Sequence, residues 1–189
     1  MEADSPSQTK VSFRALIVLG SVALFVYLID QISKVLIVSS MYEGQQIDVV
    51  GSVLRFHFVK NSGAAFSIGT GSTWIFSIIG VGVLAFVIWY APRIRSLAWA
   101  ILFGLLLGGL LGNLTDRLFR EPGFGVGHVI DFIQIPVLPA IFNLADSAIV
   151  ASMGLLLILM LRGVPMDASH QLNHQSGGSD DNEAGGAVG

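Results

Sequence analysis

Cysteine is absent from this chain of 189 residues, and charged residues are scarce. The lack of cysteine excludes disulfide bonds, thiolate nucleophiles and cysteine-ligated zinc or iron–sulfur centres. Aspartate, glutamate, lysine and arginine make up only 12% of the sequence, whereas a soluble domain usually carries about a quarter. The net charge of −3 gives no electrostatic basis for binding nucleic acid, so we expect no nucleic-acid partner.

Apolar residues are abundant instead. They make up 53% of the chain and give it a mean hydropathy of +0.73, which indicates that membrane lipids surround much of the protein. Four apolar stretches each approach the roughly 20 residues needed to cross a bilayer. They cover residues 13–38, 72–91, 97–116 and 141–161. Because continuous runs of this length satisfy their backbone hydrogen bonds in lipid as helices, the sequence predicts an all-α membrane protein with four transmembrane helices.

The segments between the spans follow different patterns. Residues 46–59 contain two apolar runs separated by Gly51 and Ser52, and the second run alternates as a strand does. We therefore expect a small β-hairpin at the membrane surface. Residues 129–137 form another short apolar run, in which Pro136 argues against a helix.

The chain divides into three parts, namely an N-terminal tail (1–12), a four-helix membrane domain (13–162) and a polar C-terminal tail (163–189) that we expect to be disordered. Four spans place both tails on the same side of the membrane. Lysine and arginine are split evenly between the two sides, so the positive-inside rule gives no direct majority. If Lys34 and Arg117 are set aside as site residues, the rule favours cytoplasmic termini.

Polar residues of the membrane domain gather on the side opposite the tails. The ends of the first and third spans share that side with the starts of the second and fourth. The group comprises Asp30, Lys34, Asn61, Asn113, Asp116, Arg117, Asp131, Asn143 and Asp146. This segregation predicts a polar and reactive site at one boundary of the bilayer.

The end of the third span carries a polar stripe beside glycines. Gly109, Asn113 and Arg117 follow one another at intervals of four and share a helical face. Gly108 and Gly112 form a small-xxx-small pair that lets a neighbouring helix approach closely. We therefore expect Asn113 and Arg117 to point into the bundle.

Asp131 and Asp146 are the candidate catalytic pair. Asp146 is expected about five residues inside the fourth helix, and an acid within a span is a functional candidate by default. Asn143 lies on the same face and suits the N-cap position. Two close carboxyl groups of low solvation share one proton, so one can activate water while the other donates to a carbonyl oxygen. Asp116 is equally compatible with a charge that marks the membrane interface, and we assign it a structural role.

Three other functions remain open at this point. A small ion or proton-coupled transporter would use Asp131, Asp146 and Arg117 as a path, although such a path needs ionisable groups at several depths. A membrane scaffold would leave the inward acids unexplained. A metal-dependent hydrolase would recruit His57 or His128, whereas the acid pair itself requires neither a metal nor another cofactor.

Five sequence blocks, in this order and spacing, resemble the lipoprotein signal peptidase (signal peptidase II) family. They are residues 30–34 (DQISK), 61–66 (NSGAAF), 108–117 (GGLLGNLTDR), 129–132 (VIDF) and 142–146 (FNLAD). The resemblance extends over residues 13–162 and leaves only the two tails unmatched.

The resemblance implies an aspartic endopeptidase of the bacterial cytoplasmic membrane. Such an enzyme cleaves prolipoproteins just before a diacylglyceryl-modified cysteine at the outer face, and it is inhibited by the cyclic peptide globomycin. Its partners are thus lipid-modified substrates and membrane lipids. By this resemblance Asp131 and Asp146 are catalytic, and the hairpin is an extracytoplasmic cradle beside a segment that closes over substrate. Residues that bind substrate or support the pair would be Asn61, Asn113, Arg117 and Asn143, while Asp30 and Lys34 would be structural.

Overall fold

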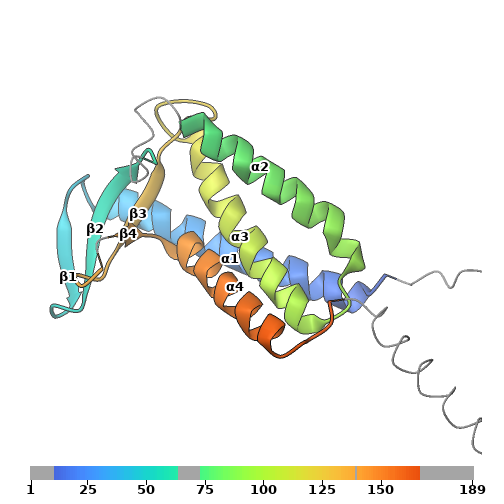
Figure 1. Ribbon diagram of the computed structural model, residues 1–189. Helices are drawn as coiled ribbons and strands as arrows, with labels where there is room; N and C mark the ends of the chain where they lie inside the picture. Colours follow the sequence, from blue (N-terminus) through green and yellow to red (C-terminus); the bar gives the residue numbers. More distant parts are fainter. Residues whose placement is uncertain (1–10, 64–72, 139, 167–189) are drawn as a thin grey trace, which may run out of the picture.

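The computed structural model describes residues 11–63, 73–138 and 140–166. Its four long helices are each long and apolar enough to cross a membrane, as the sequence predicted. They are α1 (Phe13–Ser40), α2 (Thr73–Tyr90), α3 (Leu97–Phe119) and α4 (Leu144–Leu161). Figure 1 shows them side by side, with a small sheet at one end of the bundle.

Several helix boundaries differ from the expected ones by one to three residues, and α1 and α3 each extend further than expected, to Ser40 and Phe119. A 3-10 turn, η2 (Ala91–Arg93), follows α2. The fourth helix begins at Leu144 rather than at 141, because Ile141–Phe142 form the short strand β4 and Asn143 is the N-cap. Ile141 and Phe142, which the hydropathy pattern assigned to the fourth helix, thus belong to the sheet.

Glycine allows α3 to lie at the centre of the bundle. A Cβ atom on Gly108 would lie 2.7 Å from the Ala23 carbonyl oxygen of α1, and one on Gly109 would lie 2.6 Å from the Ala145 carbonyl oxygen of α4. Side chains at these positions would force the helices apart. The predicted close approach at the small residues is confirmed, and it brings three helices together below the sheet.

The sheet confirms the predicted hairpin and extends it. Strands β1 (Gln46–Val50), β2 (Leu54–Asn61) and β3 (Val129–Gln134) lie beside β4 in the order β1-β2-β3-β4, and every neighbouring pair is antiparallel. Phe58, Ile130 and Phe132 pack with Ile37 and Met41 from the end of α1. The sheet is therefore anchored on the first helix.

The opposite end of the bundle holds the larger apolar core and both described ends of the chain. Trp99 donates its indole N–H to the Val164 carbonyl oxygen at 3.0 Å, and the Arg95 N–H reaches the Met166 carbonyl oxygen at 3.3 Å. The first residues of the expected C-terminal tail thus contact α3 and the turn before it. Residues 1–10 and 167–189 lie outside the described part of the chain.

A buried polar cluster ties α1 to α3 just below the sheet. The Lys34 ammonium lies 2.8 Å from carboxylate oxygens of both Asp30 and Asp116, and all three side chains are fully buried. Asp116 also pairs with Arg120 at 2.6 Å and accepts the Ile130 N–H of β3. One cation and its partners therefore join two helices and the sheet.

Replacement of Lys34 by methionine should destabilise the protein strongly. The change keeps the length of the side chain but leaves Asp30 and Asp116 buried without their shared cation. Breaking a buried ion pair typically costs about 3–5 kcal/mol, which for a chain of this size lowers the midpoint of thermal unfolding by roughly 10 °C. Unfolding of the purified protein in detergent measures the shift.

Lys60→Met is the matched control, because Lys60 is one-third exposed and its ion-pair partners among the described residues, Glu43 and Glu121, are themselves exposed. Surface ion pairs contribute little, so its midpoint should stay near that of the parent protein. Equal midpoints for the two variants would contradict a stabilising role for the Lys34 cluster.

Candidate active site

Asp131 lies in the middle of β3 and is 2% exposed. The Asn61 amide of β2 donates to one of its carboxylate oxygens at 2.7 Å, and the Asn143 amide donates to the other at 2.6 Å. Antiparallel pairing of β2 with β3 brings Asn61 to this position from 70 residues away. Both oxygens of Asp131 are therefore oriented by amide donors.

Asp146 lies in the first turn of α4, which differs from the expected depth of five residues. It is the third residue of the helix and forms a capping box with Asn143. The Asn143 side chain accepts the Asp146 N–H at 2.9 Å, and the Asp146 carboxylate accepts the Asn143 N–H at 3.3 Å. The expected N-cap role of Asn143 is confirmed.

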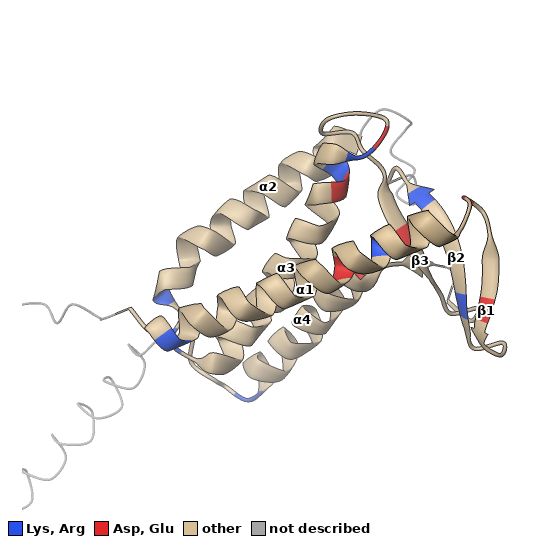
Figure 2. Ribbon diagram, turned by 180° about the vertical axis from the view of Figure 1, so that it is seen from behind, with Lys and Arg blue, Asp and Glu red and all other residues tan. Residues whose placement is uncertain are grey.

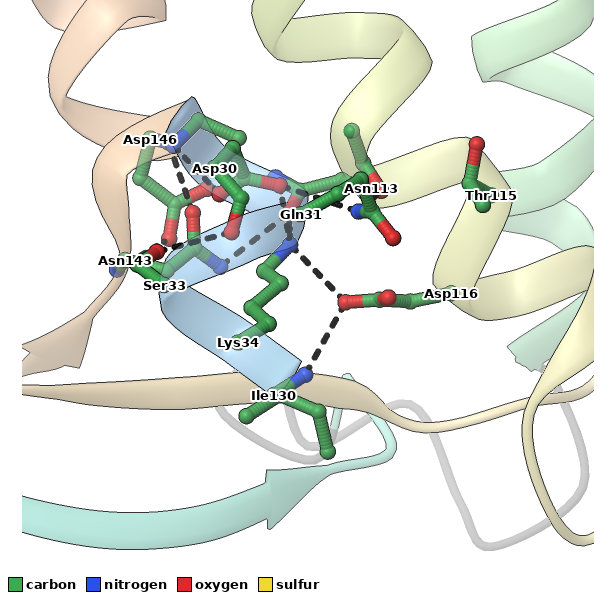
Figure 3. Close-up of polar contacts among 12 residues, drawn as sticks. Asp30, Gln31, Ser33, Lys34, Asn113, Thr115, Asp116, Ile130, Asn143 and Asp146 are labelled. Carbon is green, nitrogen blue, oxygen red and sulfur yellow. Dashed lines mark hydrogen bonds and ion pairs between the residues drawn. The ribbon is translucent and has the colours of Figure 1, made fainter. Parts of the chain in front are cut away.

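Asn143 brings the two acids together, since its amide binds Asp131 while its backbone N–H binds Asp146. Asp131 is buried, whereas Asp146 is partly exposed. The predicted pair thus meets where β3 passes the start of α4. Figure 3 shows Asp146 and Asn143 close to the Lys34 cluster.

Asn113 connects this pair to the buried cation. Its amide donates to Asp146 at 2.7 Å, and its carbonyl oxygen accepts from the Lys34 ammonium at 3.1 Å and from the Asn143 amide at 3.1 Å. Because an ammonium can only donate, the Asn113 oxygen must face Lys34 and its NH₂ group must face Asp146. The cluster in Figure 3 therefore fixes the orientation of a donor to the predicted catalytic acid.

Arg117 lies on the same stripe of α3, beside a cavity of about 160 Å³ between α2, α3 and α4. Its guanidinium stacks 5.0 Å from the centre of the Phe76 ring. One buried terminal nitrogen finds no hydrogen-bond acceptor among the described residues. Asn113, which donates to Asp146, lines the same cavity, so Arg117 and an amide that contacts the predicted pair border one space.

Burial raises the pKa of Asp131 to about 6. Smaller contributions are included in this value: the amide donors Asn61 and Asn143 and the charge of Lys34 lower the pKa, and the negative charge of Asp146 raises it. Asp131 can therefore hold a proton near neutral pH, where an exposed aspartate is fully ionised.

The structure brings all nine predicted site residues to one end of the bundle, and the expected pair of Asp30 with Lys34 forms. Two residues of the site had no predicted role. Gln31 donates to Asp30 and to the Gly112 carbonyl oxygen at 3.1 Å each, and Arg120 holds Asp116. The four-residue spacing of Asp116 and Arg120 was a signal for that pair.

The histidines considered as metal ligands lie apart from the acids. His128 lines a different cavity with Lys60, and His57 lies on β2 with one buried ring nitrogen unpaired. Within the described ranges, no three histidine or carboxylate side chains are arranged to hold a metal ion. Residues 64–66 of the NSGAAF block, and the segment expected to close over substrate, lie outside the described residues.

Sequence comparison gives relatives over most of the chain. A lipoprotein signal peptidase of Leifsonia xyli subsp. xyli is 71% identical over 181 residues, which cover 96% of this chain and 84% of that protein. A lipoprotein signal peptidase of Streptomyces coelicolor is 47% identical and covers 87% of this chain and 80% of its own length. One of Mycobacterium tuberculosis (strain ATCC 25618 / H37Rv) is 42% identical over 154 residues, 82% of this chain and 76% of its own.

Structural comparison agrees. A bacterial membrane enzyme solved by the in meso method at 1.9 Å resolution superposes with a TM-score of 0.71 and 29% sequence identity, over 82% of this chain and 97% of that one. The family model described as signal peptidase (SPase) II matches residues 22–162, a range that includes all the site residues described above. The chain therefore belongs to the signal peptidase II family.

Proposed function

We propose that the protein is an aspartic endopeptidase that removes the signal peptide from diacylglyceryl-modified prolipoproteins, just before the lipidated cysteine. The peptidase family and relatives that are named lipoprotein signal peptidases support the substrate class. The observation that carries the mechanism is the meeting of Asp131 and Asp146 on either side of Asn143. Each acid is held by amide donors at the sheet end of a membrane bundle.

The two acids take different parts in the reaction. Asp131, whose pKa is raised to about 6 by burial, holds the shared proton and donates it to the scissile carbonyl oxygen. Asp146 accepts hydrogen bonds from Asn113 and from the Asn143 N–H, so its surroundings suit a carboxylate that takes a proton from the attacking water. The new C–O bond gives a tetrahedral intermediate. Asp146 then passes its proton to the amide nitrogen while Asp131 takes back the proton from the former carbonyl oxygen, and the C–N bond breaks.

Arg117 and its cavity suit the substrate backbone beside the pair. Arg117 lines the same space as Asn113, and one of its buried terminal nitrogens has no acceptor among the described residues. A carbonyl oxygen of the bound peptide would satisfy this donor and would orient the scissile bond. A buried donor without a partner is costly, so part of that cost would be recovered only when substrate binds. Asn61 and Asn143 support the pair, and Asp30, Lys34 and Asp116 act behind them as structural residues.

The charges at the two ends of the bundle support one orientation once the site residues Lys34 and Arg117 are set aside, since the end with the termini then carries more lysine and arginine. Figure 2 shows acidic residues at the sheet end, whereas the described charged residues at the other end are all basic. We place the basic end and both termini in the cytoplasm. The acids then lie at the outer face of the bacterial cytoplasmic membrane, where a lipid-anchored peptide can enter from the bilayer. Globomycin is expected to block this site.

Asp131→Asn and Asp146→Asn should each abolish cleavage, because an amide can neither take up nor release the required proton. A loss of at least 10²–10⁴-fold is the usual range for general acid–base catalysis. The assay is the gel shift of a diacylglyceryl-modified precursor incubated with each purified variant. EDTA should leave the activity of the parent enzyme unchanged, since the proposed chemistry uses no metal.

Asp48→Asn is the control for these variants. Asp48 is an exposed acid of β1 that pairs with Arg55 at 2.6 Å, on the same side of the membrane as the site. The Asp48→Asn enzyme should cleave the precursor at the rate of the parent enzyme. Substantial activity in either catalytic variant, or inhibition by EDTA, would refute the metal-free pair.

Asp116→Asn should affect stability more than chemistry. Its carboxylate balances Lys34 and Arg120 but makes no hydrogen bond to either catalytic acid. We expect a lower thermal midpoint, with cleavage by the folded fraction retained at low temperature. A complete loss of cleavage in a folded variant, as for Asp146→Asn, would move Asp116 into the catalytic machinery.

The pH dependence should report the proton on Asp131. Because the free enzyme must hold that proton, kcat/KM should decline as the pH rises above about 6. Asn61→Ala removes a donor that lowers the pKa of Asp131, so the decline of its residual activity should begin at higher pH. A decline at the same pH in both proteins would argue against Asp131 as the proton donor.

A further inference from the structure

A second cavity of about 360 Å³ lies outside the candidate active site. Its wall combines the end of α1, the end of α3, the turn that follows α3, and strands β2 and β3. Lys60 and Ile130 are paired in register and both line it, whereas Val59 and Asp131 form the next pair. Successive side chains of a strand point to opposite faces. The cavity therefore lies on the face of the sheet opposite Asp131.

Two cations line this cavity. Arg120 uses its Nε atom to bind Asp116 at 2.6 Å, and among the described residues its two terminal nitrogens have no recorded acceptor. Lys60 lies 3.4 Å from Glu121 and 3.8 Å from Glu43, both of which are well exposed. Such surface pairs are weak, so an anion of suitable geometry can replace Glu121 beside Lys60.

The turn that carries Arg120 and Glu121 is held in place by backbone hydrogen bonds. The Gly127 N–H donates to the Arg117 carbonyl oxygen at 2.9 Å, and the His128 N–H donates to the Glu121 carbonyl oxygen at 2.8 Å. Arg120 is fixed as well, because Asp116 beneath it is fully buried. Arg120 thus has a preformed position, which lowers the entropic cost of binding.

The rim of the cavity is apolar and lies at the membrane boundary. Val38 lines it near the end of α1, and Phe119 lines it at the last residue of α3. Phe119 is 75% exposed and makes an edge contact with Phe124, which is 79% exposed. Adjoining apolar side chains that are this exposed commonly mark contact with a membrane or another protein, and Phe119 is the last residue of a transmembrane helix. Arg120 follows the span directly, so cations and lipid-facing side chains meet here.

We propose that this cavity binds the phosphate headgroup of a membrane phospholipid. The free nitrogens of Arg120 and the Lys60 ammonium contact the phosphodiester, as arginine forks and lysine charges commonly do. Val38 and Phe119 lie against the upper part of the acyl chains. The volume is within the usual range of small-ligand pockets, and the bound lipid would lie on the face of the sheet away from the catalytic pair.

Native mass spectrometry of the full chain in detergent, titrated with phosphatidylglycerol, tests the proposal. The parent protein should retain one lipid, and Lys60→Gln and Arg120→Gln should each weaken that retention at least fivefold. Lys60→Gln is the decisive variant because Lys60 does not contact the buried cluster. Glu121→Gln should strengthen binding at least twofold, since it removes the anion that competes for Lys60.

Arg55→Gln is the matched control. Arg55 lies on the same strand as Lys60, on the same side of the membrane, and pairs with Asp48 away from the cavity. Its retention of lipid should equal that of the parent. The proposed lipid site would be refuted if Lys60→Gln retained the lipid as well as the parent does. It would also be refuted if Arg55→Gln lost as much lipid as Lys60→Gln.

Soluble glycerol phosphate separates a lipid site from a site for free phosphate esters. If the acyl chains contribute through Val38 and Phe119, glycerol phosphate should displace the lipid only at concentrations at least a hundredfold higher. Displacement at equal concentration would overturn the assignment to a lipid. Because binding is measured without peptidase substrate, failure here would leave the catalytic variants as an independent test of the proposed function.

Discussion

The buried ammonium of Lys34 is the interaction on which the rest of the site depends. It neutralises Asp30 and Asp116 on two helices, and it also donates to the carbonyl oxygen of Asn113. A lysine offers only donors, so this last contact determines which end of the Asn113 amide faces Asp146. A structural ion pair thereby controls the hydrogen bonding of a proposed catalytic group. The cost of burying the charge is offset only while every partner stays in place.

The same cluster also positions the sheet. Asp116 accepts the N–H of Ile130, which directly precedes Asp131, and Asp30 accepts the N–H of Ala145, which directly precedes Asp146. Each buried carboxylate of the cluster thus binds the backbone of the residue that precedes a member of the proposed catalytic pair. Backbone bonds of this kind fix position more tightly than flexible side chains do. The separation of the two acids is therefore set by α1 and α3, although neither acid belongs to those helices.

Much of this arrangement could be predicted from the sequence, because hydropathy reports lipid-facing helices directly and spans alternate across the membrane. That alternation alone placed the polar residues of distant segments together. The predicted start of α4 was wrong because Ile141 and Phe142, which form a strand, are as apolar as the residues of the helix that follows. Hydropathy cannot separate these cases, and Asp146 consequently seemed deeper than it is. The role of Gln31 depends on a tertiary contact with the Gly112 carbonyl oxygen, which no local pattern contains, whereas the pair of Arg120 with Asp116 is a local one that the four-residue spacing already indicated.

The two faces of β3 explain why a small sheet suits an enzyme of the membrane surface. One face presents Asp131 to the bundle, and the neighbouring residue Ile130 faces the proposed lipid cavity. Alternation along a strand makes such a division unavoidable. A substrate that is itself lipid-anchored must reach the first face through the bilayer. A phospholipid held at the second face would fix the height of the sheet relative to the headgroups, and so would hold the acids level with the peptide bond that we propose they cleave.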